Sequence, residues 1–184
     1  MPIKRAYVAL LRGINVGGNA KIPMKLLGEL CASIGWTGVR TLLQTGNIVF
    51  NASGSAAEME KEIDQALRKR FGFPITVVIR DAVTFRSYVA QVPLAAQAAI
   101  DPSHVLLYLT KLPPRPGAAQ VLGPRALAGE IVVVAGDVLW IYFPNGIGSS
   151  KLTPAVIDRA VGSPATGRNW NTVLKIQQLC SHSE

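Results

Sequence analysis

The chain has 184 residues, of which 49% are hydrophobic and only 16% are charged. This composition excludes an intrinsically disordered chain, and the length fits one large domain or two small ones. The formal net charge is +8, and residues 1–97 hold 12 basic but only 6 acidic side chains. Such a positive field favours encounters with anionic partners such as nucleic acid or phosphorylated metabolites.

The N-terminal apolar run, residues 6–11, is too short for the hydrophobic region of a signal peptide or for a membrane span. We therefore expect a cytoplasmic protein with no membrane association. Cys31 and Cys180 each lie in an apolar helical pattern, which predicts buried thiols. His104 and His182 have no ligand spacing around them, so we expect no metal and no other cofactor.

Hydrophobic periodicity in the first half predicts the order β-α-β-β-α-β, followed by one more short helix. The predicted strands are short apolar runs at residues 7–11, 39–43, 47–50 and 75–79. A first helix begins near Pro23 and ends at Gly35. Ser55 and Glu58 have the spacing of a capping box before the second helix, and Asp81 caps the last one.

The second half repeats this order after a connection rich in alanine and proline, residues 93–102. Its predicted strands are residues 105–109, 131–135 and 138–143, with a short sixth piece near 164–166. Its predicted helices are a weak one at 118–127, one that begins at Thr153 and Pro154, and a final one that carries Trp170.

These two series of elements predict an α+β protein of two tandem ferredoxin-like (βαββαβ) units with mainly antiparallel sheets. The first unit, with its extra helix, covers residues 1–92. The second, shortened unit and its C-terminal helix cover residues 103–184. A single mixed sheet is the alternative fold.

A glycine-rich loop leaves the first strand with more hydrogen-bond donors than packing requires. Its residues are Arg12, Gly13, Asn15, Gly17, Gly18, Asn19 and Lys21. Glycines expose backbone N–H groups, and a loop of this kind before a helix can cradle an anion. It is not a P-loop, because Asn19 stands where that motif needs lysine. The alternative is an ordinary connection whose asparagines satisfy its own turns.

Two further stretches carry polar side chains of the same kind. The turn "QTGN" supplies Gln44 and Asn47, and we expect this hairpin at the opposite end of the sheet from the first loop, so that the two need not meet in one unit. Near the C-terminus, "TGRNWNT" supplies Arg168 and Asn169, and "NGIGSSKLT" supplies Lys151. The structural alternatives are an ordinary turn, an asparagine cap on the last helix and a tryptophan in the core.

Familiar catalytic patterns are missing from the sequence. No histidine lies beside a nucleophile, and no G-x-S-x-G occurs. Most carboxylates of the first half lie on the helix at residues 58–64, where they form a solvated face rather than an acid–base pair. The third strand lacks the aromatic pattern of RNA-recognition modules.

The stretches "YVALLRGINVGG", "VRTLLQTGNIVF", "NGIGSSKLT" and "TGRNWNTV", in this order, resemble the bacterial family known only as domain of unknown function 1697. The resemblance covers essentially the whole chain. It implies an α+β fold of ferredoxin-like character and no established activity. The motif residues of the family correspond here to Arg12, Asn15, Gly17, Gly18, Gln44, Gly46, Asn47, Arg168, Asn169 and Thr172.

Abundant donors and few acid–base partners predict a binding protein for an anionic ligand, either nucleic acid or a phosphorylated small molecule. The residues expected to bind it are Arg12, Asn15, Gly17, Gly18, Lys21, Gln44, Asn47, Lys151, Arg168 and Asn169. One alternative is a small acyl-phosphate hydrolase or phosphotransfer enzyme, with Arg12 and either Asn15 or Asn47, by analogy with certain ferredoxin-like enzymes. The other is a protein-interaction module.

Overall fold

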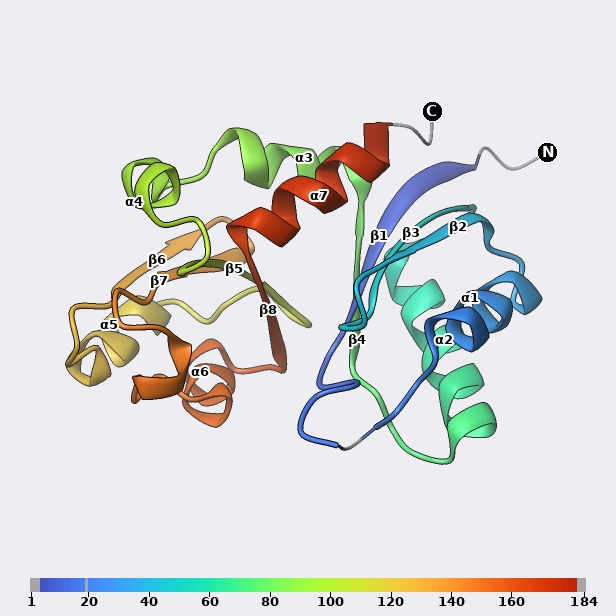
Figure 1. Ribbon diagram of the computed structural model, residues 1–184, viewed down its shortest axis with the longest axis horizontal. Coiled ribbons are helices and arrows are strands. Elements are labelled where there is room, and N and C mark those ends of the chain that lie inside the picture. The colour runs from blue at the N-terminus through green and yellow to red at the C-terminus, as the bar shows by residue number, and fades with distance from the viewer. Residues whose placement is uncertain (1–3, 19, 182–184) are drawn as a thin grey trace. The chain divides into compact units, whose positions relative to one another are not determined.

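The protein is built from two four-stranded antiparallel sheets, each covered by helices (Figure 1). A computed structural model describes residues 4–18 and 20–181. Its contacts divide the chain into two compact units: unit 1 holds the described residues up to Ala90 and those from Lys175 onward, and unit 2 is Gln91–Leu174. The predicted fold class, α+β with two tandem ferredoxin-like units, is confirmed.

The sheet of unit 1 has the strand order β2-β3-β1-β4. Its strands are β1 (Arg5–Leu11), β2 (Thr37–Leu42), β3 (Asn47–Ala52) and β4 (Val77–Asp81). Its helices are α1 (Met24–Ser33), α2 (Ala56–Phe71) and α3 (Ala82–Ala90). Helices α1 and α2 lie on one face of this sheet (Figure 1), as the βαββαβ order requires.

The core of unit 1 forms between the sheet and these two helices. Ala9 of β1 pairs with Ile48 of β3 on one side and Ile79 of β4 on the other, and all three are buried. Ile63 of α2 is fully buried in the same cluster. The neighbouring positions Val8 and Leu10 are buried too, so β1 is covered on both faces, which explains its continuous apolar run.

The predicted helix caps in unit 1 are confirmed. The backbone N–H of Glu58 donates to Ser55 Oγ, and the backbone N–H of Ser55 donates to Glu58 Oε2 at 2.9 Å, which completes the capping box of α2. Gly72, with φ of 81°, ends this helix in the left-handed conformation. Asp81 caps α3, because its carboxylate accepts from the backbone N–H of Thr84 at 2.9 Å.

Unit 2 repeats the topology with the strand order β6-β7-β5-β8. Its strands are β5 (Val105–Thr110), β6 (Ile131–Ala135), β7 (Val138–Tyr142) and β8 (Ala165–Asn169). Its helices are α4 (Ala95–Ile100), α5 (Ala118–Leu122), the short 3-10 helices η1 (Gly123–Arg125) and η2 (Ile147–Ser149), α6 (Pro154–Val161) and the start of α7 (Trp170–Ser181).

Three details of unit 2 differ from the sequence-based expectation. The sixth piece expected near 164–166 is a five-residue strand, β8, paired along β5. The helix expected over 118–127 ends at Leu122 and continues as η1, where Pro124 has no N–H to donate. The connection at 93–102 contains α4, a short helix of alanines with little apolar periodicity.

Helix α7 begins in unit 2, and its last turns belong to unit 1. Within unit 1, Arg40 of β2 donates from Nη2 to the backbone carbonyl of Leu179 at 3.0 Å. Cys180 is buried beside this contact, and Cys31 is buried on the core-facing side of α1; both are free thiols, as predicted. Burial raises the pKa of Cys31 to about 12 and that of Cys180 to about 11, so both stay protonated and unreactive at neutral pH.

Candidate functional site

The β1–α1 loop, residues 12–23, and the β2–β3 hairpin lie at the same end of unit 1. Leu10 of β1 pairs with Asn47 at the start of β3, and the backbone N–H of Leu11 donates to the carbonyl of Gly46 at 2.8 Å. The expectation that the two connections lie at opposite ends was wrong. Helix α1 returns the chain, so β2 runs parallel to β1, and both strands end on the same side.

The connection from α2 to β4 reaches this end as well. Leu11 pairs with Val77 at the start of β4, and the backbone N–H of Arg12 donates to the carbonyl of Thr76 at 2.9 Å. Three connections therefore meet where β1 ends: the β1–α1 loop, the β2–β3 hairpin and the α2–β4 connection.

Asn15 fastens the β1–α1 loop to itself and to the hairpin. Its Nδ2 donates to the carbonyls of Ile22 at 2.9 Å and Gln44 at 2.7 Å, and its Oδ1 accepts from the backbone N–H of Ile22 at 2.8 Å. Both amide hydrogens are thus used by the protein itself. Asn15 holds the loop in place, and its side-chain donors do not point to a ligand.

Asn47 has a corresponding role in the hairpin. The residue is only 1% exposed, and its Nδ2 donates to the carbonyl of Leu42 at 2.8 Å and to Thr45 Oγ1 at 3.1 Å. The amide groups of Asn15 and Asn47, which the hydrolase alternative would use to position water, are therefore engaged in holding backbone and turn.

Unusual backbone conformations gather at this end of unit 1. Among the residues that the structure describes, three non-glycine residues have positive φ: Asn15 at 56°, Ala20 at 48° and Leu43 at 58°. All three belong to the β1–α1 loop or the hairpin. Residues other than glycine rarely adopt this left-handed backbone conformation, because it costs energy. Such strained residues are often found at functional sites, where the surrounding structure holds the backbone fixed.

Glycines play two different roles in these connections. Gly17 and Gly18 are exposed, with φ of 62° and 79°, and an added Cβ would meet nothing within 4 Å. Gly46, by contrast, has Leu11 Cβ and Ile14 Cδ1 only 2.7 and 2.8 Å from such a Cβ. The tip of the loop is thus open to a ligand, whereas the hairpin is packed against it. Asn19 lies outside the described residues.

An open pocket of about 490 Å³ lies beside the loop. It is lined by Asn15, Gly18, Lys21, Ile22, Pro23 and Gln44. Four residues predicted from the sequence therefore meet around one pocket: Asn15, Gly18, Lys21 and Gln44. Gly17 adjoins them in the chain, Arg12 is half-buried at the base of the loop, and Asn47 stabilises the hairpin behind them.

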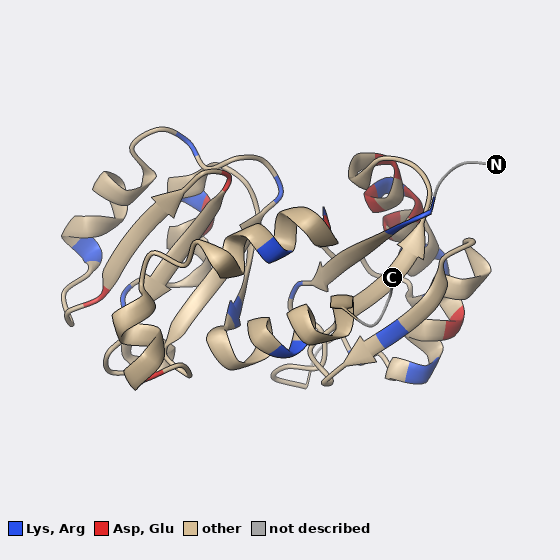
Figure 2. Ribbon diagram, turned by 90° about the horizontal axis from the view of Figure 1, so that it is seen from above, with Lys and Arg blue, Asp and Glu red and all other residues tan. Residues whose placement is uncertain are grey.

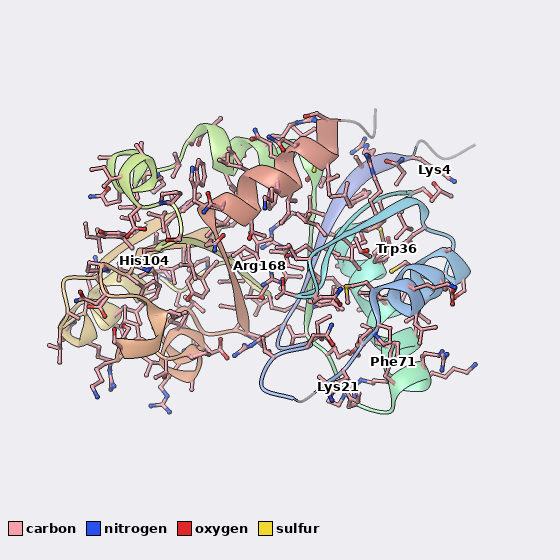
Figure 3. The ribbon with its side chains drawn as sticks, viewed as in Figure 1. Lys4, Lys21, Trp36, Phe71, His104 and Arg168 are labelled. Carbon is pink, nitrogen blue, oxygen red and sulfur yellow. The ribbon has the colours of Figure 1, made fainter. Side chains whose placement is uncertain are left out.

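Further cations lie at this end, and sequence reasoning did not assign them to the site. Lys25 is in the first turn of α1, and α2 ends in Arg68, Lys69 and Arg70. We name the set of Arg12, Lys21, Lys25, Arg68, Lys69 and Arg70 the basic end. Figure 3 shows Lys21 and Phe71, the last residue of α2, at the same end of unit 1. The signal in the sequence was the run of three basic residues directly before the connection to β4.

Acidic side chains offset little of this charge. Arg68 pairs with Asp64 one turn earlier on α2, with 3.1 Å between Nε and Oδ2 on a solvent-exposed face. The other acidic residues of α2, Glu58, Glu60 and Glu62, belong to its first half, nearer its opposite end. Figure 2 shows that Lys and Arg also occur throughout unit 2, so the concentration at the basic end is a local feature rather than the whole of the net charge.

The remaining predicted residues belong to unit 2. Lys151 is exposed between η2 and α6. Arg168, labelled in Figure 3, is half-buried on β8, and its Nη1 donates to Thr166 Oγ1 and to the carbonyl of Gly167, both at 2.8 Å. Burial lowers the pKa of its guanidinium to about 10, so it stays charged at neutral pH.

The C-terminal motif is largely explained by folding. Asn169 caps α7, because its Oδ1 accepts from the backbone N–H of Thr172 at 3.0 Å. A Cβ on Gly167 would come within 2.7 Å of the Tyr108 ring, so only glycine fits there. Trp170 is half-buried, with its ring 5.7 Å from that of Trp140.

No group of three or more His, Cys, Asp or Glu that could hold a metal ion occurs in the described part of the chain; His182 lies outside it. Among those same residues, no helix is both long enough and apolar enough to cross a bilayer.

Comparisons with known proteins agree with this description of the fold. The model of a family described as "Protein of unknown function (DUF1697)" matches residues 5–140. The solved structure of the conserved bacterial protein SP0830 from Streptococcus pneumoniae is similar, with a TM-score of 0.72 and 21% identity over 97% of this chain and 99% of that one. No curated protein matches the sequence.

Proposed function

The chain belongs to the DUF1697 family, and we propose that it is a binding protein for an anionic ligand, which it takes up in the pocket between the β1–α1 loop and the β2–β3 hairpin. Lys21 supplies the charge at this pocket, and the open backbone at Gly17 and Gly18 supplies N–H donors.

The observation that carries the proposal is the fixed backbone around the pocket. Asn15 joins both walls through its bonds to Ile22 and Gln44, in a left-handed conformation that side chains rarely adopt. A loop held this way loses little conformational entropy when a ligand binds, so more of the interaction energy remains as affinity. The basic end around it raises the rate at which anions arrive.

Binding is favoured over catalysis because the pocket is rich in donors and poor in groups that move protons. Its only ionisable lining residue is Lys21, and the amides of Asn15 and Asn47 are engaged within the protein. A hydrolase would need a group that positions or activates water. No contact of the described residues favours that alternative.

The proposal is tested by titrating inorganic pyrophosphate into the protein by calorimetry at low salt. We expect saturable binding that weakens at least about tenfold in Lys21→Ala, since a hydrogen bond to a charged group contributes about 1.5–3 kcal/mol. Lys61→Ala is the matched control, because Lys61 is an exposed lysine in the first half of α2, away from the basic end, and should leave binding unchanged. Binding that is equally strong in both variants would contradict the proposal.

A further inference from the structure

We infer that the anion taken up at the basic end is a single-stranded nucleic acid, which extends from the β1–α1 loop pocket across to Phe71, the last residue of α2, and Phe73 just after it; this inference rests on the proposed function. Four observations carry it: the cations, the exposed apolar side chains among them, an aromatic pair with an arginine over it, and the width of the surface.

The basic end combines charge with exposed apolar surface. Val16 in the β1–α1 loop is 52% exposed, and Leu43 in the hairpin is 48% exposed. Leu43 also has positive φ, so the fold places a large apolar side chain in solvent at a strained position. A simple phosphate or carboxylate would make no apolar contact with these side chains. A ligand with both a phosphate backbone and flat apolar faces would contact them as well as the cations, and nucleic acid has this combination.

The aromatic pair lies at the far side of the same end. The rings of Phe71 and Phe73 are 6.4 Å apart and inclined by 40°, and both are half-buried. The guanidinium of Arg70 lies over the Phe71 ring, with 5.8 Å from Cζ to the centroid. Aromatic faces next to cations are the elements with which proteins bind unpaired bases and the phosphates between them.

The width of the surface favours a strand over a mononucleotide. The hairpin follows β2, at one edge of the order β2-β3-β1-β4, while Phe71 and Phe73 precede β4, at the other edge. Three spacings of about 4.8 Å separate the edges, roughly 14 Å in all. One nucleotide cannot contact both edges, but a short run of nucleotides can. A duplex is a poorer fit, because its paired bases do not present their faces for stacking.

Fluorescence anisotropy with a labelled 20-nucleotide single strand and the matching duplex tests the inference, with full-length protein at 50 and 200 mM salt. We expect tighter binding of the single strand and a steep loss of affinity with salt, with a log–log slope of about −0.7 for each neutralised phosphate. The double variant that combines Lys69→Ala and Arg70→Ala should weaken single-strand binding at least tenfold. Arg159→Ala, an exposed cation on α6 of unit 2, is the matched control and should change nothing.

Variants of Phe71 test whether bases stack on its ring, because a ligand held by charge alone would bind them with unchanged affinity. Phe71→Leu keeps an apolar side chain on the core but removes the aromatic face, so single-strand affinity should fall about fivefold or more, while Phe71→Trp should retain it. Melting temperatures of the two variants establish that both are folded. Equal affinity of Phe71→Leu and wild type overturns the inference, as does a preference for duplex.

The failure of this inference can be told from failure of the proposed function. Pyrophosphate binding that depends on Lys21, without any oligonucleotide binding, overturns the inference and supports the proposed function. Absence of both kinds of binding overturns both. Oligonucleotide binding that is indifferent to Lys21, Lys69 and Arg70 overturns the inference, because the strand would then lie elsewhere on the protein. It overturns the proposed function as well only if pyrophosphate binding is also indifferent to Lys21.

Discussion

The two units leave their first strands in different ways, although their topology is the same. In unit 1, β1 leads into an open glycine-rich loop that ends at Pro23. In unit 2, β5 leads into "KLPPRPG", residues 111–117, which is stiffened by three prolines. The backbone N–H of Lys111 donates to the carbonyl of Pro164 at 2.9 Å, and that of Arg115 to the carbonyl of Val161 at 3.0 Å.

Side chains close the second connection as well. Ser163 Oγ accepts from the backbone N–H of Leu112 at 3.0 Å, and the Arg115 side chain lies directly over Gly162. The same place in the fold is therefore an open, fixed loop in one unit and a connection bound along its own α6–β8 segment in the other. A repeated fold carries a repeated core, but the chemistry at strand ends is set by each loop separately.

The largest expected effect concerns the two hairpins. Gly46→Ala would bring a Cβ to 2.7 Å from Leu11 and 2.8 Å from Ile14 at a φ of 76°, so we expect a loss of about 2–4 kcal/mol in the free energy of unfolding. Gly136 in unit 2 has a φ of 60°, and an added Cβ would meet nothing within 4 Å. Gly136→Ala should therefore lower the free energy of unfolding by only about 1–2 kcal/mol, the cost of alanine in the left-handed conformation. Urea denaturation measures both.

Equal losses in the two variants would show that the hairpin of unit 1 is not packed against the β1–α1 loop as described. A larger loss for Gly46→Ala, accompanied by weaker anion binding, would confirm that the hairpin and the loop act as one site.

The next effect compares the side chains that hold the two connections. Asn15→Ala removes three hydrogen bonds and leaves alanine in a left-handed conformation, which should cost about 2–3 kcal/mol. Ser163→Ala removes the bond to Leu112 and should cost about 1 kcal/mol. Only Asn15→Ala should also weaken pyrophosphate binding, as measured by calorimetry.

Asn15→Gly separates the two causes in this variant, because glycine accepts the backbone conformation but makes no side-chain bond. If Asn15→Gly binds pyrophosphate as tightly as wild type, the hydrogen bonds of Asn15 are not what prepares the pocket.

Local chemistry made much of the fold predictable from sequence. The buried run of β1, the capping box at Ser55 and Glu58, and the cap at Asp81 each depend on residues close in the chain. Strand β8 was underestimated because "ATGRN" has no apolar alternation. The ring of Tyr108 on the neighbouring strand lies so close to Gly167 that a Cβ there would clash, and a contact of this kind is not visible in a local pattern.

The sequence pointed to four residues that line the candidate pocket, Asn15, Gly18, Lys21 and Gln44, but not to the geometry that brings them together. Glycines and donors marked the β1–α1 loop, yet the partners of Asn15 lie 7 and 29 residues away. Residue type alone could not tell a ligand donor from a structural one. The cations at the end of α2 were missed because no local pattern shows that α2 ends beside the β1–α1 loop. The hairpin was placed at the wrong end of the sheet for a related reason: its position depends on how α1 returns the chain.

The smallest expected effect concerns acid stability, in which the two units should behave alike. Asp81 in unit 1 and Glu130 in unit 2 both have lowered pKa values. Burial alone would raise each pKa, but hydrogen bonds outweigh it: Thr84 donates to Asp81, and Ser150 and the backbone N–H of Ala128 donate to Glu130. Each carboxylate therefore stabilises the fold above its unfolded pKa, about 4, and this contribution is lost as the pH falls through the lower folded value.

Asp81→Asn and Glu130→Gln should each lower stability slightly at pH 7 and flatten its decline between about pH 5 and pH 2, because the proton uptake that destabilises the native protein has been removed. Thermal melts across this range measure the change. A flattening seen for one variant alone would extend the difference between the units beyond their strand ends. Equal flattening would mean that these two carboxylates stabilise the units in the same way. The difference between the units then remains the one between the connections after β1 and β5, of which only the first forms the proposed anion site.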